Sequence, residues 1–122
     1  MTIYGWDVVP ASVAMPISGG TVNSAAFPVP KNMLSMAIHV PALVGTTTVK
    51  IQALAPDSDQ ASEVWTDVSV FNPADGSLVA LDGIAESAVT VIPIAATGGG
   101  VLRFVATNDQ SSVPSTIKVT FV

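Results

Sequence analysis

Short runs in which apolar and polar residues alternate limit the folds that this chain can adopt. In the segment TTTVKIQAL, Val49, Ile51 and Ala53 alternate with polar residues, which places these three side chains on one face of a strand. The same period of two predicts three further inward-facing sets: Met36, Ile38 and Val40; Leu102, Phe104 and Ala106; and Ile117, Val119 and Phe121. We therefore expect half-buried β-strands.

Turn-forming residues separate these runs, in segments such as SGG, VPKN, APDSD, NPADG, LDG and TGGG. Nine prolines and nine glycines disfavour any long amphipathic helix. Pro93 interrupts the run AVTVIPI, which should confine that strand to a sheet edge or a bulge. The pattern predicts an all-β chain with about eight or nine short strands, folded as a single-domain antiparallel β-sandwich of jelly-roll or immunoglobulin-like type.

The first residues differ from the rest, because Tyr4 and Trp6 precede the first convincing strand. We expect an N-terminal arm or edge strand over residues 1–11 and the sandwich domain over residues 12–122. An edge strand would pack on the core of its own chain. An arm would reach a neighbouring subunit, since rigid aromatic side chains are favoured anchors in buried interface pockets.

Charged residues make up only 11% of the 122 residues, whereas a soluble domain has roughly 25%. This scarcity predicts that part of the exterior is covered by another protein. Membrane burial is the competing explanation, but prolines cut the apolar runs well short of the roughly 20 residues that a spanning helix needs. A net charge of −5 argues against binding to nucleic acid or to an anionic membrane. The first residues also lack the pattern of a signal peptide, so no Sec-type export is expected.

The segment ALAPDSDQASEVWTDV raises the question of a metal or catalytic loop, because it gathers four carboxylates: Asp57, Asp59, Glu63 and Asp67. Their spacing does not match a calcium-binding loop, and an acid–base pair would need a cleft that nothing in the sequence indicates. We interpret the segment as a hydrated hairpin turn, with Trp65 beginning the returning strand. His39 is the only histidine, and TGGGV lacks the residues of a phosphate-binding loop. We predict no catalytic residue, no metal site and no cofactor.

The run VWTDVSVF carries large apolar side chains on both faces of a predicted strand, with Val64, Val68 and Val70 on one face. Trp65 and Phe71 alternate onto the other face. Such a strand is either central in a sandwich whose outside is covered or part of an interface.

The order of these features resembles that of small β-sandwich proteins of tailed-bacteriophage virions. The resemblance covers roughly residues 12–122 and is carried by VAMPISGGTVNSAAFPVPKNMLSMAIHVP, TTTVKIQALAPDSDQASEVWTDV and AVTVIPIAATGGGVLRFVATNDQSSVPSTIKVTFV. In such proteins a strand of the VKIQAL type leads through an acidic turn to a tryptophan. Here Gln60, Ala61 and Ser62 lengthen that turn. Similar turns occur in carbohydrate-binding sandwiches.

The resemblance implies a non-enzymatic structural protein of the virion, made in the host cytoplasm. Its implied role is that of a cement or decoration protein, which binds the outer capsid surface and bridges major capsid subunits. The same resemblance implies a homo-oligomer, with a trimer as the best match to local symmetry axes. The expected interface residues are Tyr4, Trp6, Trp65 and Phe71, with core packing as the alternative for each. A head–tail connector, a tail or head-fibre component, and a carbohydrate-binding module are the alternative functions.

Overall fold

Four antiparallel strand pairs organise the chain as one long hairpin that is rolled up on itself. From the outermost pair inward, they are β3 (Val9–Met15) with β13 (Ser115–Phe121), β4 (Phe27–Pro28) with β12 (Val101–Ala106), β5 (Ser35–Val40) with β11 (Ala88–Pro93), and β6 (Thr48–Leu54) with β10 (Ile84–Ala85). Early strands therefore pair with late ones in nested order. This is the jelly-roll arrangement, one of the two sandwich types that the sequence predicts.

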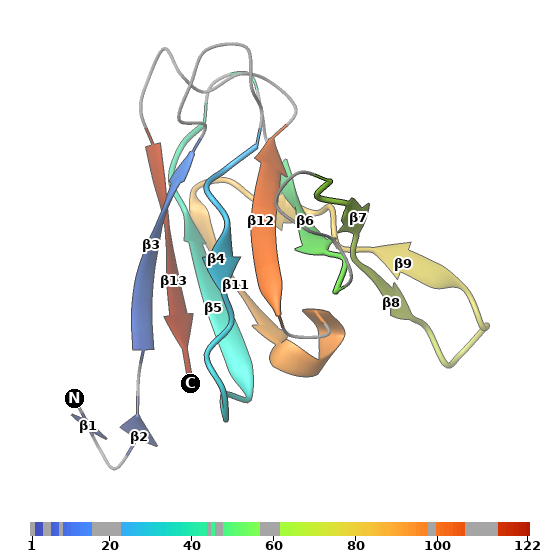
Figure 1. The fold of residues 1–122 in the computed structure, drawn as a ribbon, viewed down its shortest axis with the longest axis horizontal. Helices are drawn as coiled ribbons and strands as arrows, with labels where there is room; N and C mark the ends of the chain where they lie inside the picture. The colour runs from blue at the N-terminus through green and yellow to red at the C-terminus, as the bar shows by residue number, and fades with distance from the viewer. Residues whose placement is uncertain are drawn as a thin grey trace.

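Two further pairings join these hairpin layers into two sheets that pack face to face (Figure 1). β13 pairs with β5 to give the four-stranded sheet β11-β5-β13-β3. β12 pairs with β6 to give the sheet β10-β6-β12-β4, to which β7 (Trp65–Asp67) is added beside β6. The predicted all-β sandwich is confirmed, and the only helical element among the described residues is the short 3-10 helix η1 (Ile94–Thr97).

The structure is a computed structural model. It describes residues 2–3, 6–7, 9–15, 23–43, 45, 48–56, 62–97, 100–106 and 115–122. Side chains are described from residue 23 onward within these ranges, except those of residues 95, 96 and 115. Within this part of the chain, no helix is long and apolar enough to cross a membrane.

The core lies between the two sheets and is built from the predicted inward-facing sets. Its fully buried side chains come from both sheets: Met36, Ile38, Val49, Ile51, Leu102, Phe104, Ile117, Val119 and Phe121. The rings of Phe27 and Phe104 stack with their centroids 5.3 Å apart, which ties the short strand β4 to the centre of its sheet. Ala53, also predicted to face inward, is only partly buried at the edge of this core.

The N-terminal segment starts with β1 (Thr2–Ile3) and β2 (Trp6–Asp7), which pair with each other beyond one end of the sandwich (Figure 1). β3 then begins at Val9 and forms one edge of the four-stranded sheet. Residues 9–11, predicted as arm or edge strand, thus lie in an edge strand. Tyr4 and the side chain of Trp6 lie outside the described part of the chain.

One predicted strand is wrong in its extent. The continuous strand expected over residues 64–71 is broken at Val68 into β7 and β8 (Ser69–Phe71). β7 stays beside β6, whereas β8 leaves the sandwich and pairs with β9 (Leu78–Ala80). Neither strand is central in a sheet, because the chain turns away from β6 as soon as Val68 has bonded to it.

Candidate partner-binding surface

The β8–β9 hairpin is an insertion that the jelly roll does not require. In the rolled hairpin, β6 and β10 form the innermost antiparallel pair, so a short turn would suffice to connect them. Residues 55–83 intervene instead. They return once along β6 as β7 and then project away from the sandwich as the two-stranded ribbon β8–β9 (Figure 1).

Three backbone hydrogen bonds close the base of this hairpin, and two of them join it to the edge of β6. Val68 N donates to Ile51 O (3.0 Å), Ile51 N donates to Leu81 O (3.1 Å), and Leu81 N donates to Val68 O (2.9 Å). The side chains of Val68 and Leu81 pack against the core. The base therefore holds the ribbon at a fixed place on the sandwich.

The tip of the hairpin is closed by bonds within the turn NPADGS. Asn72 N donates to Ser77 O (2.8 Å), and Gly76 N donates to Asn72 O (2.9 Å) with Gly76 in the left-handed region at φ 75°. The Asp75 carboxylate accepts from Ser77 N (2.9 Å) and from Ser77 Oγ (2.6 Å). These bonds favour the ionised carboxylate, the hydroxyl most of all, and lower the pKa of Asp75. A turn with this many internal bonds presents its flanking strands in a defined geometry.

Large apolar side chains are exposed along the ribbon between this base and this tip. Phe71 is 60% exposed, Leu78 is 73% exposed and Val79 is 51% exposed. Phe71 and Leu78 are cross-strand partners, so they lie side by side on one face. None of the three belongs to the core. An apolar ribbon held rigidly in water is typical of a surface that binds another macromolecule.

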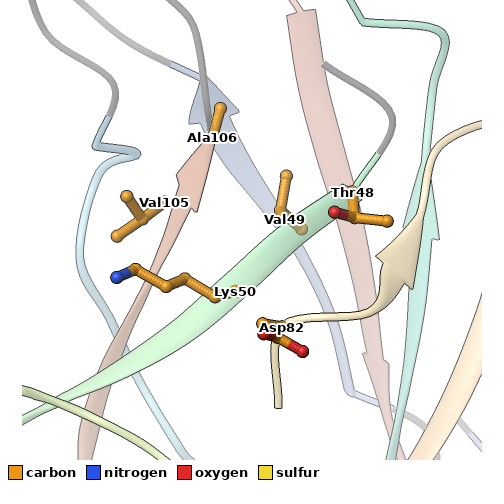
Figure 2. Close-up of a pocket in the computed structure, with 6 residues that line it drawn as sticks. All are labelled: Thr48, Val49, Lys50, Asp82, Val105 and Ala106. Atoms are coloured by element: carbon orange, nitrogen blue, oxygen red, sulfur yellow. The ribbon is translucent and has the colours of Figure 1, made fainter. Parts of the chain in front are cut away.

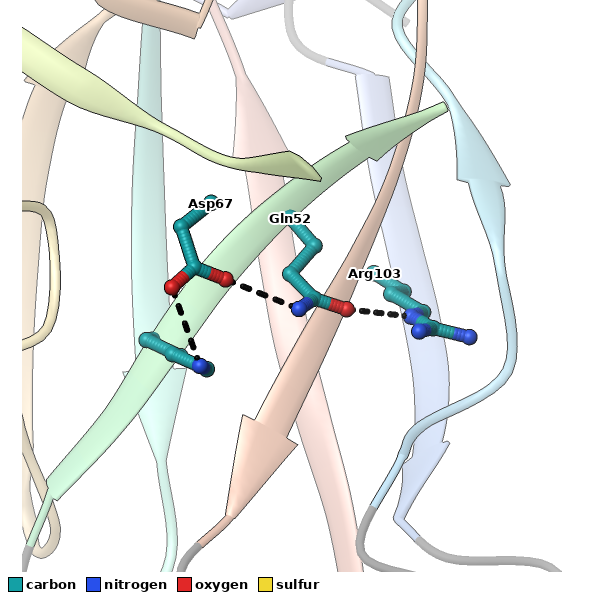
Figure 3. A network of polar contacts seen from close by, with 4 residues as sticks. Gln52, Asp67 and Arg103 are labelled. Carbon is teal, nitrogen blue, oxygen red and sulfur yellow. Dashed lines mark hydrogen bonds and ion pairs between the residues drawn. The ribbon is translucent and has the colours of Figure 1, made fainter. Parts of the chain in front are cut away.

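The outer face of the neighbouring sheet is polar and tightly bonded (Figure 3). Gln52 Nε2 donates to Asp67 Oδ1 (2.8 Å), and Arg103 Nε donates to Gln52 Oε1 (2.8 Å). Lys50 Nζ lies 3.1 Å from Asp67 Oδ2. The pKa of Asp67 is lowered, first by the bond from Gln52 and then by that from Lys50. These four residues form a polar row across β7, β6 and β12, in which the side chains bond to one another.

Trp65 lies on the same outer face and outside the core. The guanidinium carbon of Arg103 is 4.3 Å from the centroid of the indole ring, and Trp65 Nε1 donates to Glu63 Oε2 (3.2 Å). Its half-buried ring therefore has one face covered by a cation, an arrangement that stabilises the pair. A glycan site would need an open aromatic face, so only the other face of this ring is available to such a ligand.

The acidic segment forms a hairpin as predicted, because β6 and β7 pair antiparallel and Trp65 begins the returning strand opposite Leu54. Asp57 and Asp59 lie outside the described residues. Among the residues that are described, no three His, Asp or Glu side chains come together as metal ligands. His39 is exposed on β5, opposite Val89 on one side and Lys118 on the other.

A pocket of about 340 Å³ lies at the other end of β6 (Figure 2). Its lining comes from β6, β12 and the segment before β10: Thr48, Val49, Lys50, Asp82, Val105 and Ala106. Figure 2 shows the side chains of Lys50 and Asp82 pointing away from each other. Because the Lys50 ammonium is already paired with Asp67, the pocket presents no converging set of polar groups to a ligand.

Of the four interface residues predicted from sequence, Phe71 lies on the exposed hairpin and Trp65 on the polar sheet face. The structure does not bring these two together on one strand. Leu78 and Val79 were missed by the sequence analysis. Their signal was the run SLVAL directly after the turn NPADG, which is the pattern of a returning strand.

Comparison with known proteins identifies the fold alone. No protein-family model matches the chain, and no curated protein matches it. Among solved structures, the chain is similar to the crystal structure of the SPBc2 prophage-derived protein YomS, with a TM-score of 0.55 and 14% sequence identity. The match covers 98% of both chains.

Proposed function

We propose that this chain is a non-enzymatic bacteriophage structural protein that binds the outer capsid surface and bridges major capsid subunits. The observation that carries the proposal is the inserted β8–β9 hairpin, which holds Phe71, Leu78 and Val79 in water on a rigid base. The fold similarity to a prophage-derived protein supports a phage origin.

Solubility and the repetition of contacts on a capsid both support this role. Exposed apolar side chains lower solubility in a chain that has few charges to offset them, so their retention is explained by a partner that covers them. A contact centred on two or three such side chains is small. A capsid repeats it over many equivalent sites, and a protein that bridges subunits gains further from avidity. Bridging also adds buried surface that expansion of a DNA-filled shell would have to expose.

Electron microscopy of phage particles with and without the protein tests this role. The proposal expects extra density on the outer capsid surface between subunits, in contact with the hairpin. Density at the neck, the tail or a head fibre would place the chain in one of those structures and contradict the capsid role.

Loss of the protein should also weaken the particle. Heating or osmotic shock is expected to release DNA from particles that lack it more readily than from complete ones. Equal DNA retention by both kinds of particle would contradict a cementing function even if the protein lies on the capsid.

A further inference from the structure

The edge strand β11 has an open side that no charged residue of the strand protects. It borders the four-stranded sheet, and its sequence AVTVIP contains no charged residue. Edge strands usually carry lysines, inward charges or bulges, because their free backbone groups otherwise pair with other strands. β11 stands at the end of the strand order, which confirms the edge placement predicted from Pro93, and Pro93 itself occupies the last position of the strand.

The hydrogen-bond pattern shows which backbone groups of β11 face outward. Ile94 N donates to Leu34 O (2.9 Å), and in an antiparallel ladder this bond makes alternate residues from Ile94 backward face β5. Thr90 is thus bonded to β5, whereas Val89 and Val91 direct their N–H and C=O groups away from the sheet. Pro93 falls in the outward set, where its missing N–H costs no bond to β5.

The side chains of the same two valines are exposed on the outer face of the sheet. Val89 is 55% exposed and Val91 is 65% exposed. Among the described residues, no backbone group outside the ladder bonds to either valine. The edge therefore offers two free donors, two free acceptors and an apolar pair, all within three residues.

We propose that β11 pairs antiparallel with β11 of a second copy of this chain, across a two-fold axis at Thr90. Val89 then lies opposite the partner's Val91, and Val91 lies opposite the partner's Val89. Each free N–H meets a free C=O, giving about four hydrogen bonds and two valine pairs across the axis. The four-stranded sheets of the two copies become one continuous sheet.

The second copy is favoured over another strand because the edge is complementary to itself, and only the register centred on Thr90 places both exposed valines opposite valines of the partner. If the partner strand is shifted by two residues in one direction, its Pro93, which has no N–H, lies opposite Val89. A shift in the other direction places Ser87 opposite Val91, and Ser87 N already donates to Pro41 O (3.5 Å). No like charges meet across the axis, since the strand has none.

This pairing goes beyond the proposed capsid role and uses a different surface, so either can fail alone. The interface is small, and we expect it to form at high protein concentration or where copies are crowded on a particle. It predicts dimers, whereas the resemblance to virion proteins implies a trimer. Analytical ultracentrifugation separates the two states by mass.

The first test is sedimentation of the purified chain over concentrations up to about 1 mM, a range that reveals weak association. The inference expects a monomer–dimer equilibrium, with the amides of Val89 and Val91 becoming protected from hydrogen exchange as dimer forms. A chain that stays monomeric over this range, or a trimer that leaves both amides unprotected, would overturn it.

Charge substitutions at the exposed valines then test the register. V89K/V91K sets like charges opposite each other and should abolish the dimer, whereas V89K/V91E sets Lys against Glu and should restore it at low salt. V64K is the matched control, because Val64 is 54% exposed in the segment before β7 and should leave the dimer intact. Equal dimerisation of the two double variants would refute the proposed register. L78S changes the β8–β9 hairpin instead, so it should dimerise normally whatever its effect on capsid binding.

Discussion

Phe71 and Leu78 lie directly opposite each other across the β8–β9 hairpin, where both side chains remain largely exposed. Neither side chain contributes to the core, yet the backbone that carries them is anchored at the base by Val68 and Leu81 and closed at the tip by Asn72. The sandwich thus supports an apolar surface that its own stability does not require. Substitutions on this surface should therefore change binding without changing the fold.

Substitution of Leu78 should affect capsid binding without affecting the fold. For L78S we expect a change in unfolding free energy within about 0.5 kcal/mol, because the side chain is exposed. Capsid affinity should fall roughly thirtyfold, the effect of losing an interface anchor of about 2 kcal/mol. Co-sedimentation with capsids lacking the protein measures this. L34S is the matched control, since Leu34 is 81% exposed outside the hairpin. Equal losses in both variants would contradict a specific role for the hairpin.

Truncation of two phenylalanines should change the unfolding free energy by very different amounts. Phe104 is fully buried against Phe27, so F104A should lower the unfolding free energy by about 3–5 kcal/mol. F71A should change it by less than about 0.5 kcal/mol, because Phe71 lies outside the core. Urea unfolding followed by tryptophan fluorescence provides both values. A comparable loss for F71A would place Phe71 in the structural core of the protein.

The hairpin tip should be sensitive to Gly76 for reasons of backbone conformation alone. Gly76 has φ 75°, and a Cβ added there would meet no atom within 4 Å. G76A should therefore destabilise the turn by about 1 kcal/mol through strain, without any clash. Faster hydrogen exchange of the Asn72 and Gly76 amides would report this opening. G83A is the control, because Gly83 has equal space and no left-handed backbone. Unchanged exchange in G76A would mean that the turn is not held in this conformation.

The stability contributed by the polar row on the outer sheet face should depend on pH. The folded-state pKa of Asp67 is lowered, so its bonds stabilise the protein above the ordinary carboxyl pKa, and this contribution is lost as pH falls through the folded value. Q52A and K50A should each raise the pKa of Asp67, because the bond from Gln52 and the bond and charge of Lys50 all lower it. Carboxyl NMR titration measures both shifts. An unchanged pKa of Asp67 in Q52A would contradict the role of the Gln52 bond, and either variant should cost under about 1 kcal/mol on this exposed face.

The strands and the core could be predicted from sequence because they depend on local alternation. Met36, Ile51, Phe104 and Val119 all face inward as their period of two requires. Pro93 likewise marks an edge strand by its chemistry alone. These features need no knowledge of which strands are neighbours.

Features that depend on distant contacts could not be predicted in the same way. The alternation from Trp65 to Phe71 continues through Val68, and only the bond from Val68 N to Ile51 O reveals where the chain leaves the sheet. The stacking of Arg103 on Trp65 joins segments that are far apart in sequence. Jelly-roll and immunoglobulin-like sandwiches also share the same local pattern, so the pairing order of the strands is what distinguishes them.

Site-specific photocrosslinking from the hairpin tests whether the hairpin contacts the major capsid protein. A photoreactive amino acid replaces Leu78 in one variant and Leu34 in another, and each variant is assembled onto particles before illumination. We predict a crosslink from position 78 to the major capsid protein and a much weaker one from position 34. A crosslink to capsid from position 34 but not from position 78 would contradict the assignment of the β8–β9 hairpin as the capsid-binding surface.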